Sequence, residues 1–295
     1  MRVLLLLCIG LCCFKCVSQE NDSYEFIGTL QTSDGAIMTY KLNFKELEGG
    51  IIEGYSLTDF KGEQRTKSKI KGTLNSKDKI ISFKELANIS TRSNAKPNEF
   101  CYVNVKNAII KIGKEKSIIQ GKFKGVFEND SSCVNGYLYL LSTDFLFKQL
   151  DKAYMYLDTT KMADSVKRAA LNKQTTIKNS IDQNYLNTDG VLKIKWDSEE
   201  IILELWDAEK VDQDRITIYI NNKKIADNFL IQHEKKYFVI PFNENKCIIK
   251  IVANNEGESP PNTAHIILKD GNAYTPIVTN LRKEETAIIV LEKSK

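Results

Sequence analysis

The densest group of residues that could do chemistry is an acidic run late in the chain. Asp207, Glu209, Asp212 and Asp214 fall within eight residues, between two predicted strands. Carboxylates this close together in a loop can share a hard cation such as Ca²⁺, although the EF-hand glycine and glutamate positions are absent here. Asp212 and Asp214 fit equally well a tight turn whose side chains bond their own backbone. We therefore expect no cofactor, and we keep Ca²⁺ at these four residues as a hypothesis beside the turn.

The sequence contains few residues or motifs for metal binding by histidine, nucleophilic catalysis or phosphate binding. The two histidines, His233 and His265, lie in separate segments, so the sequence has neither a metal-ligand spacing nor an HExxH motif. The GxSxG, GxGxxG and P-loop motifs are also absent from the sequence. A glycosidase needs only two carboxylates, which composition cannot exclude. We expect no enzyme, and keep an unrecognised carboxylate-based hydrolase as the last alternative.

Three of the seven cysteines lie beyond residue 18. Cys101 and Cys133 each open an alternating apolar run, which favours a disulfide between them. Closing a loop of this length would stabilise the fold by roughly 3–4 kcal/mol. Cys247 lies in an apolar run and is expected to be a buried free thiol. Ordinary core packing of all three side chains is the alternative.

The first eighteen residues have the layout of a cleaved secretory signal. A short positive start is followed by an apolar stretch from Val3 to Phe14, and small residues precede Gln19. The stretch is too short for a membrane span and polar chain follows it. We expect cleavage between Ser18 and Gln19 and an exported protein, periplasmic or extracellular. The residues before Cys12 and Cys16 fit a lipoprotein signal poorly.

Charge argues against one class of partner. The 42 basic and 38 acidic side chains become 40 and 38 once Arg2 and Lys15 leave with the signal, and the two signs are interspersed. The densest basic stretch, from Arg65 to Lys71, alternates with polar and apolar residues, as on the outer face of a strand. We expect no nucleic-acid partner and no transmembrane segment after cleavage. The expected partner is an envelope protein or a glycan surface.

Residues 19–142 form a series of short alternating runs separated by turn residues. A glycine recurs inside these runs at Gly28, Gly54, Gly72, Gly121 and Gly136. Because glycine weakens a strand, this repeated placement indicates sharp bending in a closed or strongly coiled antiparallel sheet. We predict a mostly β fold that starts with an antiparallel meander, as a small β-barrel or a highly curved sheet. An open β-sandwich is the alternative.

The rest of the chain divides near residue 190. Residues 143–190 begin with apolar residues at helical spacing and then become polar, which predicts a helical connector followed by a linker. Residues 191–295 carry roughly seven alternating runs, the size and rhythm of an antiparallel β-sandwich. The linker, Asn172 to Gly190, has few apolar residues, so we expect it to be mobile and the two β domains to fold separately.

Several blocks of the last domain carry a resemblance. Glu204–Asp207, Asp212–Asn221, Ala253–Gly257 and Pro260–Ala264 resemble a β-sandwich module of uncharacterised secreted and envelope proteins of Bacteroidota-type bacteria. The resemblance covers about residues 191–292. It implies an exported β-sandwich and implies no activity, because such a module accompanies many different partners.

These observations lead to one expected function. We predict an exported, non-catalytic binding or scaffold protein of the cell envelope that acts through β-domain surfaces. Trp196, at the end of its strand, is the predicted surface aromatic contact, whereas Trp206 is predicted to be core. The alternative is a carrier that holds a small apolar ligand in the N-terminal barrel. A barrel interior filled by Phe44, Ile81 and Phe123 would argue against the carrier.

Overall fold

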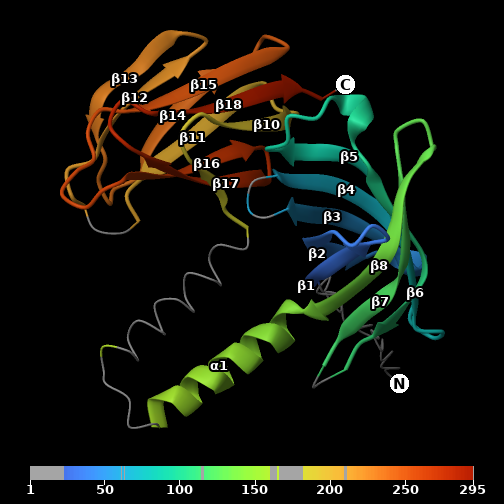
Figure 1. The fold of residues 1–295 in the computed structure, drawn as a ribbon. Coiled ribbons are helices and arrows are strands. Elements are labelled where there is room, and N and C mark those ends of the chain that lie inside the picture. The colour runs from blue at the N-terminus through green and yellow to red at the C-terminus, as the bar shows by residue number, and fades with distance from the viewer. Residues whose placement is uncertain are drawn as a thin grey trace, which may run out of the picture.

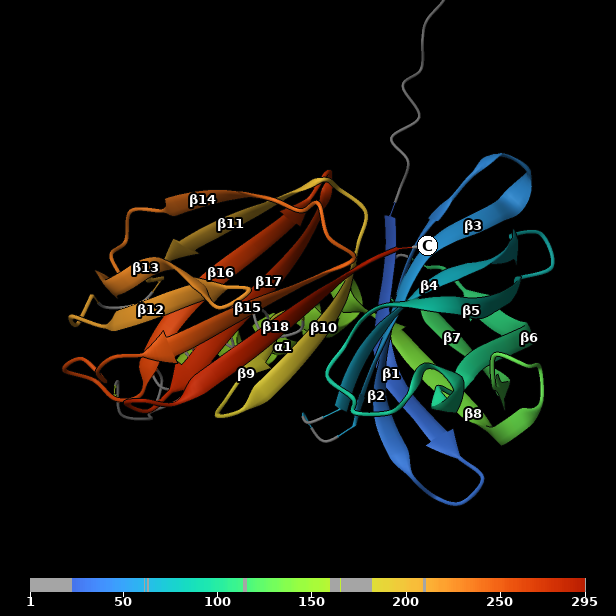
Figure 2. The ribbon, with the colours of Figure 1, turned by 90° about the horizontal axis from the view of Figure 1, so that it is seen from above.

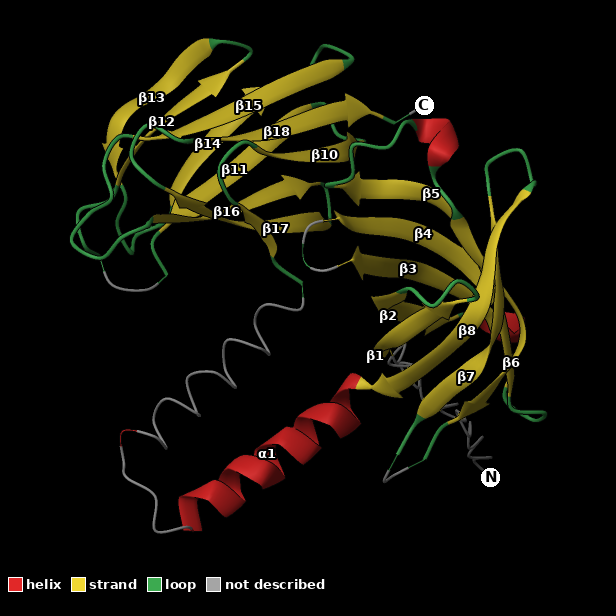
Figure 3. Ribbon diagram, in the orientation of Figure 1, coloured by secondary structure: helices red, strands yellow, loops and turns green. Residues whose placement is uncertain are grey.

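In the described part of the chain the fold is mostly β, with one long helix between two groups of strands (Figures 1 and 3). The computed structural model describes residues 23–60, 62, 64–113, 116–159, 165, 182–208 and 211–294. The signal predicted over residues 1–18 lies outside this part of the chain. The predicted order of an antiparallel domain, a helix and a second β domain is confirmed.

Eight antiparallel strands form the N-terminal barrel. They are β1 (Ser23–Thr32), β2 (Ile37–Glu46), β3 (Ile51–Phe60), β4 (Gln64–Asn75), β5 (Ile80–Thr91), β6 (Tyr102–Lys111), β7 (Ile118–Val126) and β8 (Ser132–Ser142). Neighbours in sequence pair as hairpins, β8 pairs with β1, and β5 pairs with β6, which closes the sheet. Short 3₁₀ turns, η1 (Glu48–Gly50) and η2 (Pro97–Glu99), connect strands. The closed barrel, rather than the open sandwich, is the correct form.

The recurring glycines have a geometric cause. A Cβ atom at Gly54 would lie 2.0 Å from the carbonyl oxygen of Asn43 on the neighbouring strand. Any side chain would therefore push the two strands apart at this point. Glycine lets the strands approach and bend, which is what a small barrel requires.

Side chains fill the barrel. Its core contains Phe26, Leu30, Tyr40, Leu42, Phe44, Ile52, Ile81, Phe83, Ile119, Phe123, Leu138 and Leu140. Phe44 and Ile81 are fully buried, and Phe123 is 4 % exposed. An interior packed in this way argues against a barrel that carries a small apolar ligand.

One carboxylate lies inside this packed interior. Glu85 accepts hydrogen bonds from the Tyr40 hydroxyl (3.0 Å), the Ser56 hydroxyl (2.5 Å) and the Val103 N–H (2.7 Å). Burial raises the pKa of Glu85, and the three donors oppose this effect. Because both carboxylate oxygens have partners, Glu85 is a satisfied interior group.

The helix α1 (Thr143–Thr159) follows the barrel directly and extends away from it (Figure 1). The Ser142 hydroxyl accepts the N–H of Phe145 at 3.4 Å, at the first turn of the helix. Within the described residues, no helix is long and apolar enough to cross a membrane.

Two packed sheets form the C-terminal domain. Their strands are β9 (Asn184–Leu186), β10 (Gly190–Trp196), β11 (Glu200–Trp206), β12 (Arg215–Ile220), β13 (Lys223–Leu230), β14 (Lys236–Pro241), β15 (Lys246–Ala253), β16 (Asn262–Asp270), β17 (Ala273–Leu281) and β18 (Thr286–Lys293). One sheet has the order β13-β12-β15-β18-β10 and the other β14-β11-β16-β17-β9. Each sheet contains one parallel pair, β10–β18 and β9–β17, in an otherwise antiparallel arrangement.

The two domains share a sheet. Lys193 and Ile194 of β10 pair with Thr91 and Ser90 of β5, so one sheet of the sandwich continues into the barrel as thirteen strands. Figure 2 shows the sandwich lying beside the barrel. The expectation of separate domains on a tether therefore needs correction.

The end of the predicted linker is also docked. Residues 184–186 form β9 and pair with β17. Asp182 and the Gln183 carbonyl contact the barrel through Lys41 and Arg65. Backbone pairing, two cationic partners and the buried Leu186 side chain, which belongs to the sandwich core, hold this part of the linker in place. Residues 172–181 lie outside the described residues.

Candidate functional site

The disulfide prediction is confirmed. Cys101 and Cys133 are bonded, and they lie at the ends of β6 and β8 on either side of β7. Cys247 is a buried free thiol, 2 % exposed, within β15. Burial, with a smaller effect of Glu244, raises the pKa of Cys247 to about 11. This thiol is therefore protonated and inert at neutral pH.

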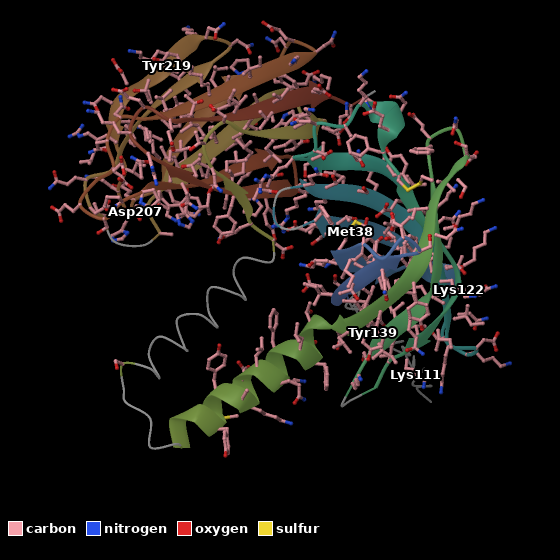
Figure 4. The ribbon with its side chains drawn as sticks, viewed as in Figure 1. Met38, Lys111, Lys122, Tyr139, Asp207 and Tyr219 are labelled. Atoms are coloured by element: carbon pink, nitrogen blue, oxygen red, sulfur yellow. A yellow bond between two sulfur atoms is a disulfide. The ribbon has the colours of Figure 1, made fainter. Side chains whose placement is uncertain are left out.

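The acidic residues organise a loop. Asp207, Asp212 and Asp214 are all buried. In Figure 4, Asp207 lies at the end of the sandwich that points away from the barrel. The Asp212 carboxylate accepts the Ser259 N–H at 2.8 Å, and that of Asp214 accepts the Thr263 N–H at 2.7 Å. Both bonds reach backbone N–H groups 47 and 49 residues further along the chain, so they are not the bonds to the local backbone that the turn alternative predicts.

The calcium hypothesis for this loop stays a prediction. Among the described residues, no group of three or more carboxylate, histidine or cysteine side chains is arranged to hold a metal ion. Glu209 lies outside the described residues. Burial raises the pKa of Asp214 to about 6; the Thr263 N–H opposes this, and the Asp212 and Asp207 carboxylates add to it.

The two tryptophans have exchanged their predicted places. Trp196 is fully buried, and its indole N–H donates to the Glu200 carbonyl at 3.1 Å. It shares the inward face of β10 with Leu192 and Ile194, so the predicted surface contact at Trp196 is wrong. Trp206 lies on the outer face of β11, where the Lys235 ammonium is 4.5 Å from its ring centroid. The alternation of β10, with lysines at positions 193 and 195, already indicates an inward Trp196.

A cleft at the domain junction is the candidate site. It has a volume of about 700 Å³ and is lined by both domains. One wall is the outer face of β3, β4 and β5, and the other is β9, β17 and the residues beside them. The lining residues that concern its chemistry are Tyr55, Leu57, Lys67, Lys69, Leu86, Ile89, Asp182 and Tyr274. Ligand sites commonly occur at such domain interfaces and within this size range.

A half-buried lysine forms part of the barrel wall. The Lys67 ammonium lies 3.9 Å from the centroid of the Tyr55 ring. No carboxylate of the described residues lies within 4.0 Å of it. Burial lowers the pKa of Lys67, Asp182 opposes that effect, and Lys41 and Arg65 add to it. The cleft therefore contains a partly desolvated cation that an anion would stabilise.

Charge and apolar surface lie side by side in the cleft. Lys69 and Lys71 follow Lys67 on the same strand, and the Lys71 ammonium is paired with Glu53 at 3.1 Å. Leu86 is 45 % exposed and Tyr274 is 66 % exposed. A ligand with an anionic group and an apolar part would contact both kinds of surface.

Two cations fix the walls of the cleft to each other. The Lys41 ammonium, 1 % exposed, pairs with Glu25 and lies 2.6 Å from an Asp182 carboxylate oxygen. The Arg65 guanidinium donates to the Gln183 carbonyl at 2.5 Å. Because both contacts join β2 or β4 to the chain that enters the sandwich, the cleft has a defined width.

The sequence predicted the strand face that forms the barrel wall of the cleft, but it did not predict that the second domain lies over this face. The run from Arg65 to Lys71 does form the outer face of β4, as predicted, but the second domain covers part of that face. Lys41 and Asp182 are separated by 141 residues, and no local pattern indicates their contact. The exposed ring of Tyr274 lies on β17, a strand that the sequence pattern does not reveal.

Fold and site define a mostly β protein with a closed barrel, a sandwich and a cationic cleft between them. Comparisons with protein-family models, with curated proteins and with solved structures find no match for this chain. The resemblance of residues 191–292 to an exported Bacteroidota-type module therefore stays a prediction.

Proposed function

We propose that this chain is an exported, non-catalytic binding protein of the cell envelope, and that the cleft between its domains is the binding site. The ligand would carry one anionic group and an adjoining apolar part. The observation that carries this proposal is Lys67, a half-buried ammonium without a carboxylate partner among the described residues. The disulfide is compatible with an exported location.

The arrangement of the cleft supports this ligand chemistry. An anion at Lys67 would also approach Lys69 and the Tyr55 hydroxyl. Burial, followed by the Asp182 and Glu25 carboxylates, raises the pKa of Tyr55, so this hydroxyl remains a hydrogen-bond donor to an anion at any physiological pH. The apolar part would lie against Leu86 and Tyr274 and bury their exposed surface.

The experiment uses three probes to measure separately how the anionic group and the apolar part of the ligand contribute to binding. Octyl phosphate has both the anion and the apolar chain, inorganic phosphate has only the anion, and octanol has only the chain. Isothermal titration calorimetry of the full chain should show binding of octyl phosphate at least tenfold tighter than either partial probe. Equal binding of octyl phosphate and octanol would mean that the cationic side chains do not contribute.

Matched variants locate the binding. Lys67→Met keeps the aliphatic length and removes the charge, so octyl phosphate should bind about tenfold more weakly, which corresponds to about 1.4 kcal/mol. Lys250→Met makes the same change on β15, on an exposed face of the sandwich, and should leave binding unaltered. If both variants weaken binding equally, the effect is one of net charge and the cleft is not the site.

The hydrolase alternative stays a prediction with weaker support. Glu53 and Asp182 are the carboxylates that line the cleft. Glu53 is paired with Lys71 and Asp182 with Lys41, so both are engaged by cations. Neither carboxylate is therefore free to act on a substrate without breaking an ion pair.

A further inference from the structure

A second surface, on the barrel, differs from the rest of the molecule in its charge. The three neighbouring strands β6, β7 and β8 carry Lys106, Lys111, Lys122 and Lys124 and contain no aspartate or glutamate. The chain as a whole has nearly equal numbers of basic and acidic residues. All four lysines are exposed. In Figure 4, Lys122 points away from the barrel on the side opposite the sandwich.

This surface is grooved. A depression of about 880 Å³ crosses β6, β7, β8 and the turn after β1. Adjacent strands lie about 4.8 Å apart, so the groove crosses about 14 Å of sheet. The lining side chains on its outer face come from alternate positions of the strands, among them Lys122 and Lys124 on β7 and Asn135 and Tyr137 on β8.

The side chains of the groove combine charge, amides and one ring. Lys106, Lys122 and Lys124 line it together with the amides of Gln31, Asn104 and Asn135. Tyr137, 44 % exposed, is the exposed aromatic ring among the described residues of the groove. Asp130, in the turn after β7, is the carboxylate at its edge.

We propose that this lysine groove binds an anionic polysaccharide, a polyuronate chain. Three clustered lysines repel one another in the free protein, and a polyanion removes that repulsion. Amide side chains can bond sugar hydroxyls, and an exposed tyrosine offers a ring face to a sugar. The flat surface of a bilayer cannot enter a groove, and single-stranded nucleic acid requires several stacking rings in succession.

This site is independent of the interdomain cleft. It lies on β6–β8, whereas the cleft lies on β3–β5 and the sandwich. A protein with both sites would attach to a charged glycan through the barrel and take a smaller ligand at the junction. If binding at one of the two sites is not found, the proposal for the other site is unaffected.

The test uses polygalacturonate and the full chain. Affinity electrophoresis in gels with polygalacturonate should retard the protein, and gels with neutral dextran should not. The double variant Lys122→Gln/Lys124→Gln should lose at least tenfold in affinity. The single variant Lys250→Gln, on a comparable exposed lysine near Tyr219, should bind as the unaltered protein does.

Three results would overturn the proposal. The first is the absence of retardation by polygalacturonate, and the second is an equal loss in the Lys250 control. The third is tighter binding of single-stranded DNA or of anionic phosphatidylglycerol vesicles than of polygalacturonate at physiological salt. Lys67→Met, the cleft variant, should leave the retardation unchanged, so the two sites are tested separately.

Discussion

The Lys41 ammonium lies between the barrel and the sandwich and contacts both carboxylate oxygens of Asp182, at 2.6 and 2.7 Å. Lys41 is 1 % exposed, whereas Asp182 is 53 % exposed. The lysine is thus the buried member of a pair that joins two domains. Its aliphatic chain is buried at the interface between the domains, and its charge is paired there with Asp182.

Replacement of Lys41 should cost more stability than replacement of its partner. Lys41→Ala leaves a cavity and two unneutralised carboxylates, so we expect a loss of about 3 kcal/mol. Asp182→Asn leaves Lys41 paired with Glu25, so we expect a loss of about 1 kcal/mol or less. Urea unfolding curves give both values. Lys45→Ala, an exposed lysine on the same strand, serves as the control, and a larger loss for Asp182→Asn than for Lys41→Ala would contradict this account.

Cutting the connection between the domains should not separate them. Trypsin cleavage at Lys173 or Lys178 is expected to give two pieces that elute together in gel filtration. The β5–β10 pairing and the Lys41–Asp182 pair join the barrel to the C-terminal piece without the cut segment. Denaturation in urea should then separate the pieces. If they separate at once in native buffer, the shared sheet does not hold the domains together.

Labelling with a thiol reagent should distinguish the disulfide-bonded Cys101 and Cys133 from the free Cys247. Native protein should show essentially no accessible thiol, and denaturation without reductant should release one, from Cys247. Reduction of Cys101–Cys133 should lower the free energy of unfolding by roughly 3–4 kcal/mol. Cys101→Ser/Cys133→Ser should show the same loss without reductant. Three thiols released on denaturation would mean that the bridge does not form.

Asp214 should make stability depend on pH. Its pKa is about 6 in the folded protein and 3.8 in an unfolded reference. Between these values the folded state holds a proton that the unfolded state has released, so stability should rise as pH falls from 7 toward 4. The full effect is at most about 3 kcal/mol, since one pKa unit corresponds to about 1.4 kcal/mol.

The variant Asp214→Asn isolates this effect. An asparagine can replace the protonated acid, so the variant should be more stable than the unaltered protein at pH 7.5 and equal to it near pH 4.5. Differential scanning calorimetry across this range measures the difference. A constant difference at all pH values would mean that Asp214 titrates normally.

Calcium addition tests the remaining hypothesis for the same loop. If Asp207, Asp212 and Asp214 hold Ca²⁺, millimolar calcium should raise the melting temperature at pH 7.5 by mass action. Asp214→Asn should abolish this rise, and Mg²⁺ should produce less of it because it dehydrates reluctantly. Calorimetric titration without heat, together with an unchanged melting temperature, would end the calcium hypothesis.

Local patterns predicted most of the fold. The glycines inside alternating runs predicted a small barrel or a highly curved sheet, and in the structure a Cβ atom at each of them would meet the backbone or a side chain of a neighbouring strand. The paired positions of Cys101 and Cys133 predicted the disulfide. Three strands of the sandwich were missed for local reasons. β9 has three residues and lies in the predicted linker, β13 is a polar edge strand, and β17 contains Pro276, which weakens a strand pattern.

The cleft could not be predicted from local sequence patterns. Its walls come from β3–β5 and from β9 and β17, and their approach depends on a two-residue strand pairing and a contact across 141 residues. Alternation along β4 shows which face a lysine takes, but it does not show what covers that face. Such information exists only in the tertiary arrangement.

The position of β18 has a consequence for the order of folding. This strand contains the highest-numbered residues of the sandwich, yet it lies in the middle of its sheet, between β15 and β10. While the chain is being synthesised, β15 can pair with β12 and β10 with β5, but each of them lacks its second neighbour until residues 286–293 emerge. β10, the strand that pairs with the barrel, thus gains its second partner last. Premature termination would remove the central strand β18 and leave the edges of β15 and β10 exposed and prone to aggregation.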